Sequence, residues 1–339
     1  MTHDGAVLEL TPDPQARQRL ILHINGVTAG ADKQKRDLAA LQRMAPTAYV
    51  RGIHNASVDW RTDILESILG RSELWQYQQG NGETQQRLAG YSHLLQQLLD
   101  QPEIPPDADL RQYLPQANTG TGLLDGELLR QLPFIYQLTW QDVLQYLYGD
   151  YPAGASCATL RLAYELARGI RRGVPVLVVA HSQGLIITAL ATYILGHFFG
   201  SATRWQEQVY ILGYGPVILL EELPPGLRGH TILIQDRHDL VAEAFSNMRY
   251  TDFWNVLQTQ FWRTIQRWNQ LPELARPDSQ HSAGYYLGLL GTPASQRSGE
   301  LIEYFVSQEW YQNPVMQRFR GIRLILEDLV PGGALAVRN

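Results

Sequence analysis

The sequence predicts an α/β fold in which a mainly parallel sheet is flanked by helices. Short apolar segments rich in β-branched residues alternate along the chain with longer segments whose apolar residues recur at helical spacing. Such alternation is typical of parallel sheets. The 339 residues are 45% hydrophobic and 18% charged, which is ordinary for a globular protein. We expect a single domain over residues 1–339.

The first strand–helix–strand unit lies near the start of the chain. Residues 19–26 (RLILHING) form an apolar run that ends at a glycine, and residues 47–55 (TAYVRGIHN) form a second run. Between them, residues 32–45 have the spacing of an amphipathic helix. Two strands joined through a helix are normally parallel neighbours, so this unit predicts the beginning of a parallel sheet.

Residues 59–152 interrupt this alternation. Three helical segments, at 62–70, 86–100 and 141–149, are separated by links that contain proline or glycine, and no strong strand lies among them. A plain loop of this length is uncommon inside a compact domain. We therefore interpret residues 59–152 as a helical insertion, or lid, within the one domain.

The alternation resumes with a helix over residues 156–173 and a strand over residues 174–180. A further helix begins at Gln183. Residues 173–203 contain no Asp, Glu, Lys or Arg, and their length would suffice to cross a membrane. The β-branched run followed by a polar, glycine-containing turn instead favours a buried strand, a tight turn and a buried helix.

Two more strands are expected at residues 208–212 and 231–235, and the chain beyond His281 has a mostly helical pattern. A helical stretch between these regions is rich in aromatic residues. Core packing is its default interpretation, and a part in lining an acyl pocket is the alternative. Its aromatic residues are Phe253, Trp254, Phe261, Trp262 and Trp268.

The junction at residues 180–184, Ala-His-Ser-Gln-Gly, places Ser182 between a predicted strand and a predicted helix. A nucleophilic serine needs a sharp turn that exposes its hydroxyl at the carboxyl edge of the sheet. The small residues Ala180 and Gly184 allow the close backbone approach that such a turn requires. The first N–H groups of the following helix favour a developing negative charge.

This junction resembles the nucleophile elbow of the α/β-hydrolase superfamily, whose motif is Gly-x-Ser-x-Gly. Ala180 replaces the first glycine, and the resemblance extends over the strand–helix alternation of residues 19–285 without the insertion. It implies an α/β-hydrolase-like sheet. It also implies a catalytic triad in the chain order serine, acid, histidine.

That order restricts the other two members of the triad. Beyond the last predicted strand only His238 and His281 remain, and the acids Asp236 and Asp239 lie just after that strand. Asp239 is closely followed by a valine, as is frequent in the family, and His238 cannot follow it. The resemblance therefore implies Ser182 as nucleophile, His281 as general base and Asp239 as the acid, with Asp236 as the alternative acid.

The resemblance also implies an oxyanion hole made of two backbone N–H groups. One is that of Gln183, the residue after the nucleophile. The other lies in the loop after an early strand, here HINGVTAG. We expect Val27 to provide it, because Gly26 permits the turn and the close approach. Another register of the same segment would make Ile24 or Asn25 the donor.

Other reactive residues have simpler interpretations. We expect His181 to be a packing residue under the elbow, and Cys157 a small core or surface residue. Asp236, His238 and Asp239 lie on one turn without a distant partner, which makes a poor metal site. We expect neither a metal nor an organic cofactor.

These observations predict a serine hydrolase that cleaves a carboxylic ester, possibly a lipid-like one, through an acyl-enzyme. Thioester hydrolysis or acyl transfer on the same triad is the nearest alternative. A non-catalytic binding protein with the same fold is an alternative of another class. The insertion and the aromatic stretch would form a lid or pocket.

Charge and composition restrict partners and location. The net charge is −5, and no block of Lys or Arg indicates nucleic acid as a partner. The single cysteine fits a reducing compartment. The first residues lack a basic segment followed by an apolar run, so we expect a cytoplasmic protein. Export without such a signal stays open, and the sequence says nothing about oligomeric state.

Overall fold

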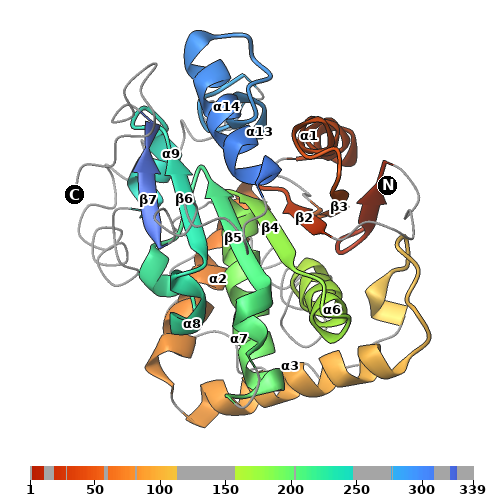
Figure 1. The fold of residues 1–339 in the computed structure, drawn as a ribbon. Helices are drawn as coiled ribbons and strands as arrows, with labels where there is room; N and C mark the ends of the chain where they lie inside the picture. Colours follow the sequence, from red (N-terminus) through yellow and green to blue (C-terminus); the bar gives the residue numbers. More distant parts are fainter. Residues whose placement is uncertain are drawn as a thin grey trace.

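The computed structural model describes residues 2–10, 19–27, 29–56, 60–80, 82–112, 157–201, 204–246, 276, 278–308 and 321–326. Within these ranges a seven-stranded sheet forms the centre of the molecule, in the order β1-β3-β2-β4-β5-β6-β7 (Figure 1). The strands are β1 (Val7–Glu9), β2 (Leu20–Ile24), β3 (Tyr49–Ile53), β4 (Val176–His181), β5 (Val209–Tyr214), β6 (Thr231–Gln235) and β7 (Ile322–Ile325).

The sheet is parallel except at one edge. β1 pairs antiparallel with β3, and every other pair of neighbours is parallel. The α/β fold class with a mainly parallel sheet and flanking helices is therefore confirmed. The five strands expected from the sequence are present, with ends that differ by up to two residues.

Two strands were not expected. β1 is three residues long and β7 is four, and β7 lies in the region that the sequence pattern made mostly helical. Segments this short carry too few alternating positions to show the two-residue period of a strand. Both lie at the edges of the sheet as far as the described residues go, and each pairs there with a single described neighbour.

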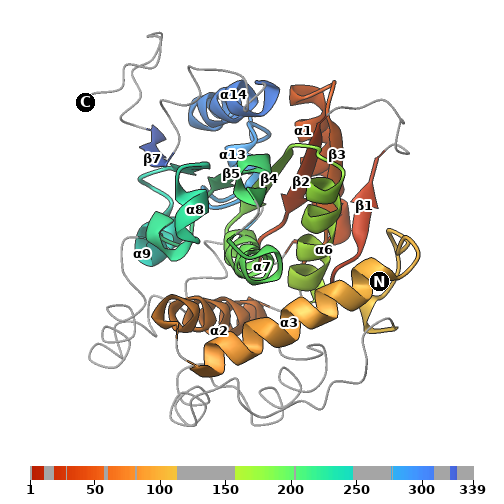
Figure 2. The same cartoon turned by 60° about the horizontal axis from the view of Figure 1, so that its bottom comes forward.

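Helices cover both faces of the sheet (Figures 1 and 2). One apolar core joins the sheet to α1, α13 and α14, and the other joins it to α6 and α7. Alternate residues of β4 serve the two cores, as the pleat of a strand requires: Val178 points to one and Val179 to the other. These helices are α1 (Ala31–Met44), α6 (Cys157–Arg171), α7 (Gln183–Phe199), α13 (Ala283–Tyr286) and α14 (Pro293–Ser307).

The described part of the predicted insertion is helical. α2 (Trp60–Gln79) and α3 (Gly82–Asp100) lie on the outer side of α6 and α7, away from the sheet (Figure 2). The helical segment expected at 141–149 and the aromatic stretch that contains Trp262 lie outside the described residues. The other helices that the structure describes are η1 (Leu110–Gln112), η3 (Trp205–Gln208), η4 (Leu220–Glu222), α8 (Pro225–Arg228) and α9 (Leu240–Ser246).

Buried polar contacts fix α2 against the rest of the fold. Arg71 is 1% exposed, and its Nε donates to Glu222 at 2.9 Å. Its Nη1 donates to the carbonyl oxygen of Phe245 at the end of α9. At Gly70 a Cβ would lie 2.7 Å from the side chain of Ile186 on α7, so the two helices approach closely there. Releasing α2 would withdraw Arg71 and leave the Glu222 carboxylate, which is 5% exposed, without this partner, which is costly.

The apolar segment that follows Ser182 is α7, a helix packed between α6, α2 and α3 on one face of the sheet. Its burial within the fold agrees with the strand, turn and helix expected from the sequence. Among the helices that the structure describes, none combines the length and the apolar composition needed to cross a bilayer.

Candidate functional site

Ser182 stands at the turn between β4 and α7. Its φ of 50° and ψ of −120° make it the one non-glycine residue with positive φ among those the structure describes. A side chain at such angles is strained, and the surrounding structure must hold it there. Gly184 explains part of the local sequence, because a Cβ at that position would lie 2.7 Å from the carbonyl oxygen of Ile24.

Three side chains form a connected hydrogen-bonded row at this turn. Ser182 Oγ lies 2.8 Å from His281 Nε2, and His281 Nδ1 lies 2.9 Å from both carboxylate oxygens of Asp239. The ionised carboxylate can only accept, so Nδ1 carries the proton and donates it. Nε2 is then free to accept the Ser182 hydroxyl proton. The three residues expected from the sequence to act together are thus in direct contact.

The row is buried. Relative exposure is 2% for Ser182, 4% for His281 and 1% for Asp239. Hydrogen bonds strengthen where water is excluded, and the orientation of the imidazole is then set by the protein rather than by solvent.

Asp239 is held by donors on several sides. Its Oδ1 accepts from the backbone N–H groups of Val241 and Ala242, at 3.1 and 3.0 Å, at the start of α9. Its Oδ2 accepts from the hydroxyl of Tyr286 at 2.8 Å. Together these three donors fix the position of the carboxylate. Sequence reasoning missed Tyr286, which lies far along the chain and carries no motif.

Asp236 has a different role. Its Oδ1 accepts from the backbone N–H of His238 at 2.7 Å, and its Oδ2 accepts from the hydroxyl of Tyr285. The backbone N–H of Asp236 donates to the Tyr286 hydroxyl at 3.0 Å, which in turn donates to Asp239. The structure therefore brings Asp239 to His281, while Asp236 closes the turn and holds the two tyrosines.

The loop after β2 lies directly against the nucleophile. A Cβ at Gly26 would lie 2.8 Å from Ser182 Cβ and 2.7 Å from His181 Nδ1, so only glycine fits. Val27 comes directly after this point of closest approach, and its side chain is half-buried. Gln183 is the first residue of α7, where N–H groups have no acceptor within the helix. Both residues expected to form the oxyanion hole therefore adjoin the elbow.

The side chain of Asn25 fixes this loop. Its Nδ2 donates to the carbonyl oxygens of Gly26, Ala29 and Asn55, and its Oδ1 accepts from the Asn55 N–H at 2.8 Å. Asn25 thus joins the ends of β2 and β3. Through these bonds its side chain sets the backbone around Gly26.

The side chain of Gln183 connects the elbow to α2. Its Oε1 accepts from Asn55 Nδ2 at 2.7 Å, and its Nε2 donates to Glu66 Oε2 at 3.0 Å and to the carbonyl oxygen of Asp63 at 3.2 Å. Glu66 and Asp63 lie in the first turns of α2. The residue whose N–H was expected in the oxyanion hole is therefore immobilised through its side chain, a role that no motif indicates.

A buried polar layer lies beneath the elbow. His23 Nε2 and the Tyr214 hydroxyl are 2.9 Å apart. Burial lowers the pKa of His23 to about 3, so this imidazole is neutral at neutral pH. Burial raises the pKa of Asp37, on α1, to about 7, while Lys33 on the same helix opposes the shift.

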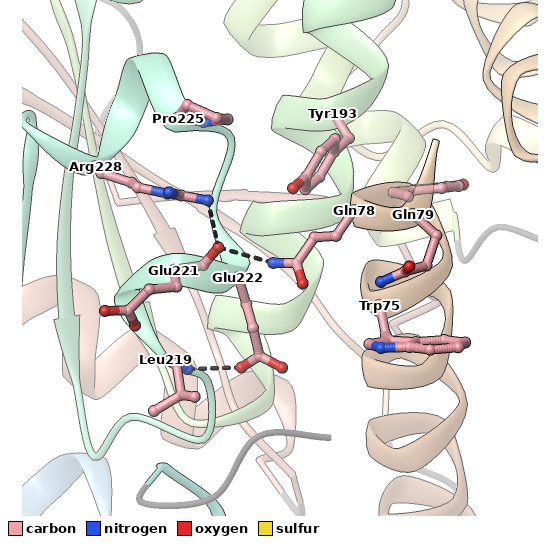
Figure 3. A pocket seen from close by; sticks show the side chains of 10 residues that line it. Trp75, Gln78, Gln79, Tyr193, Leu219, Glu221, Glu222, Pro225 and Arg228 are labelled. Atoms are coloured by element: carbon pink, nitrogen blue, oxygen red, sulfur yellow. Dashed lines mark hydrogen bonds between the residues drawn. The ribbon is translucent and has the colours of Figure 1, made fainter. Parts of the chain in front are cut away.

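A separate pocket of about 510 Å³, which Ser182 does not line, is shown in Figure 3. Trp75 and Gln78 of α2, Tyr193 of α7 and Arg228 of α8 line it. Tyr193 is eleven residues beyond Ser182 along α7, or about 16 Å at the helical rise. The polar groups of its wall bond to each other: Gln78 and Arg228 both donate to the carbonyl oxygen of Glu221.

The described residues hold no cluster of three or more His, Cys, Asp or Glu side chains suited to bind a metal ion. Cys157, which is buried at the start of α6, is a core residue. Ser156, the first residue of the helix expected over residues 156–173, lies outside the described residues.

Comparison with protein-family models, with curated proteins and with solved structures finds no match for this chain. The fold itself, a mostly parallel seven-stranded sheet flanked by helices, is compatible with an α/β-hydrolase. Any activity must therefore be inferred from the geometry of the chain's own residues.

Proposed function

We propose that this chain is a serine hydrolase of α/β-hydrolase type that cleaves a carboxylic ester through an acyl-enzyme. The observation that carries the proposal is the buried row of Ser182, His281 and Asp239, with donor–acceptor distances of 2.8 and 2.9 Å. A serine, a histidine and an acid in this contact are the arrangement that activates a hydroxyl for attack on a carbonyl.

The chemistry proceeds in two halves. Ser182 Oγ attacks the ester carbonyl carbon while its proton passes to His281 Nε2, and Asp239 stabilises the resulting imidazolium. The N–H groups of Gln183 and Val27 stabilise the negative oxygen of the tetrahedral intermediate. Collapse releases the alcohol, which takes the proton from His281. Water, deprotonated by His281, then attacks the acyl-enzyme and releases the carboxylic acid.

The acyl group that we propose is apolar, as in a lipid-like ester. The nucleophile is almost completely buried, and α2 is joined to the elbow through Gln183, so the insertion is well placed to cover a substrate. A panel of p-nitrophenyl esters of rising acyl length measures this preference. A parallel panel of acyl thioesters distinguishes thioesterase chemistry on the same triad.

We also propose a cytoplasmic location for this activity. The single cysteine is buried and free, so the fold needs no disulfide. Cell fractionation with an antibody against the chain tests this, and recovery of the protein outside the cytoplasm would contradict it.

The deciding test is labelling with a fluorophosphonate, followed by peptide mapping of the adduct. We expect the adduct on Ser182. Ser182→Ala and His281→Ala should abolish it, whereas Ser307→Ala, an exposed serine at the end of α14, should leave it unchanged.

Labelling should also be tried with a small sulfonyl fluoride, which reaches a covered serine more easily. If neither reagent modifies Ser182 in protein that unfolds cooperatively on heating, the hydroxyl is not activated. That result would contradict the proposal and favour a binding protein that retains the fold.

A further inference from the structure

His181, the residue before the nucleophile, is directly bonded to the backbone of the proposed base. Its Nε2 lies 2.7 Å from the carbonyl oxygen of His281. A carbonyl can only accept, so Nε2 carries the proton and donates it. The two imidazole rings lie 5.2 Å apart, with an angle of 41° between their planes. The sequence pattern assigns His181 to packing, and this hydrogen bond gives it a more specific contact.

The ring of His181 is held on several sides. It stacks on Tyr214, with ring centroids 5.1 Å apart and an angle of 27° between the planes. The Tyr214 hydroxyl is in turn bonded to His23. On the edge of the ring, Gly26 approaches so closely that a Cβ would lie 2.7 Å from Nδ1. These contacts hold the His181 side chain in one rotamer, with its Nε2–H directed at the His281 carbonyl oxygen.

The residue that receives this bond has little regular structure of its own. His281 lies in a turn before α13, closed by bonds from the Ser282 N–H to Ser279 and from the Ser279 N–H to Arg276. Its position relative to the sheet is set by the hydroxyls of Tyr285 and Tyr286 on α13, which donate to Asp236 and Asp239, and by the contacts of His281 itself. Its ring contacts Ser182 and Asp239, and its carbonyl contacts His181.

The charge state of His181 suits this place. Burial lowers its pKa well below the ordinary value for histidine, and the neighbouring His281 lowers it further. A neutral ring beside His281 does not oppose the positive charge that His281 gains when it accepts the serine proton.

We propose that His181 is a positioning residue that fixes the distance between nucleophile and base. His181 and Ser182 are adjacent in the chain, so a bond from His181 to the His281 backbone ties the base to the same rigid turn that carries the nucleophile. This role rests on the proposed hydrolase function. A misplacement of about 1 Å between reacting groups can cost about 100-fold in rate.

The test compares two substitutions at the same position. In His181→Gln the amide nitrogen reaches the place of the imidazole Nε2 and can donate to the same carbonyl. His181→Leu supplies an apolar side chain of similar bulk without a donor. We expect His181→Leu to lower kcat and the rate of fluorophosphonate labelling by about 10- to 100-fold with KM nearly unchanged. His181→Gln should recover most of that loss.

His230 provides a matched control. Its ring also bonds a backbone carbonyl oxygen, that of Val209, but it lies at the end of β5 and β6 opposite to the end that carries Ser182. His230→Leu should leave kcat within about twofold of the unmodified chain, because His230 lies far from the triad. Equal rates for His181→Leu and the unmodified chain would overturn the proposal, and so would failure of His181→Gln to exceed His181→Leu.

A second measurement does not depend on activity. In nitrogen NMR of the ¹⁵N-histidine-labelled chain, His181 should show a protonated Nε2 and an unprotonated Nδ1 throughout neutral pH. The opposite tautomer would refute the bond to His281 even if His181→Leu does not fold. Absence of labelling in the unmodified chain would refute the hydrolase proposal instead, so the two failures are distinguishable.

Discussion

Replacing Asp239 by asparagine tests how the acid holds the base. Backbone N–H groups of Val241 and Ala242 both donate to Oδ1, so the asparagine oxygen should keep that place. The new NH2 group then occupies the place of Oδ2, 2.9 Å from His281 Nδ1. Two donors cannot share a hydrogen bond, so the contact at the Oδ2 place favours the tautomer with the proton on Nε2, in competition with Oδ1, which also lies 2.9 Å from Nδ1 and still accepts in the original tautomer.

That change of tautomer sets the expected magnitude. Nε2 lies 2.8 Å from Ser182 Oγ and, once protonated, can no longer accept the hydroxyl proton. Holding the base in the wrong tautomer costs about 10⁴-fold in kcat, or about 5 kcal/mol in the activation free energy. The fold should persist, because the side chains have the same shape and the two backbone donors keep their acceptor.

The assay is the pseudo-first-order rate of fluorophosphonate labelling, with ester hydrolysis as a second readout and thermal unfolding as the check on folding. Asp236→Asn is the matched control: its Oδ1 can still accept from the His238 N–H, and Tyr285 can reorient its hydroxyl. We expect it to cost less than about tenfold, since Asp236 does not contact the base. A larger loss for Asp236→Asn than for Asp239→Asn would refute the assignment of the acid.

Three other contacts lead to separate expected outcomes. Tyr286→Phe removes the hydroxyl that donates to Asp239 Oδ2 and should lower kcat about 3- to 10-fold, since one such bond contributes about 1 kcal/mol; an unchanged kcat would contradict this. Gly26→Ala places a methyl group 2.8 Å from Ser182 Cβ and should destabilise the fold by about 1–3 kcal/mol in urea unfolding, so full stability would contradict the close approach. Burial raises the pKa of Glu73 to about 7, so its contribution to stability is present at about pH 4 and lost as the pH rises through 7. Glu73→Gln should therefore raise Tm relative to the unmodified chain more at about pH 8 than at about pH 5, and the gain in the free energy of unfolding should reach up to roughly 3 kcal/mol. A pH-independent difference in Tm would refute this.

Much of the sheet could be predicted because its strands are long enough to show a pattern. The segment at 231–235 is a strand with the predicted ends, and the first βαβ unit lies where the sequence placed it. β7 was missed because four residues at the sheet edge do not establish a period, and pairing with β6 rather than local preference makes it a strand. Here tertiary contacts determined the structure.

The candidate site could be predicted in part, because the chain order serine, acid, histidine leaves few residues that could fill each place. Ser182 and His281 could be selected from the elbow and from the small number of later histidines. The choice between Asp236 and Asp239 could not be made from spacing alone, since both follow β6. The choice depends on two tyrosines of α13: Tyr285, which bonds Asp236 from 49 residues further along the chain, and Tyr286, which bonds Asp239 from 47 residues further along. No local pattern in the sequence reveals such contacts.

The order of the strands has a consequence for how the chain is made. β2 pairs with β4 in the finished sheet, Leu20 opposite Val176, so about 155 residues separate partners that lie side by side. At ribosomal rates of about 5–20 residues per second, roughly 8–30 s pass between synthesis of the two strands. During that interval one edge of β2 has no strand beside it, and an open apolar edge invites pairing with other chains. The elbow can therefore form only late in synthesis, after α2 and α3 have left the ribosome, and until then the nascent chain exposes a strand edge that can pair with other chains.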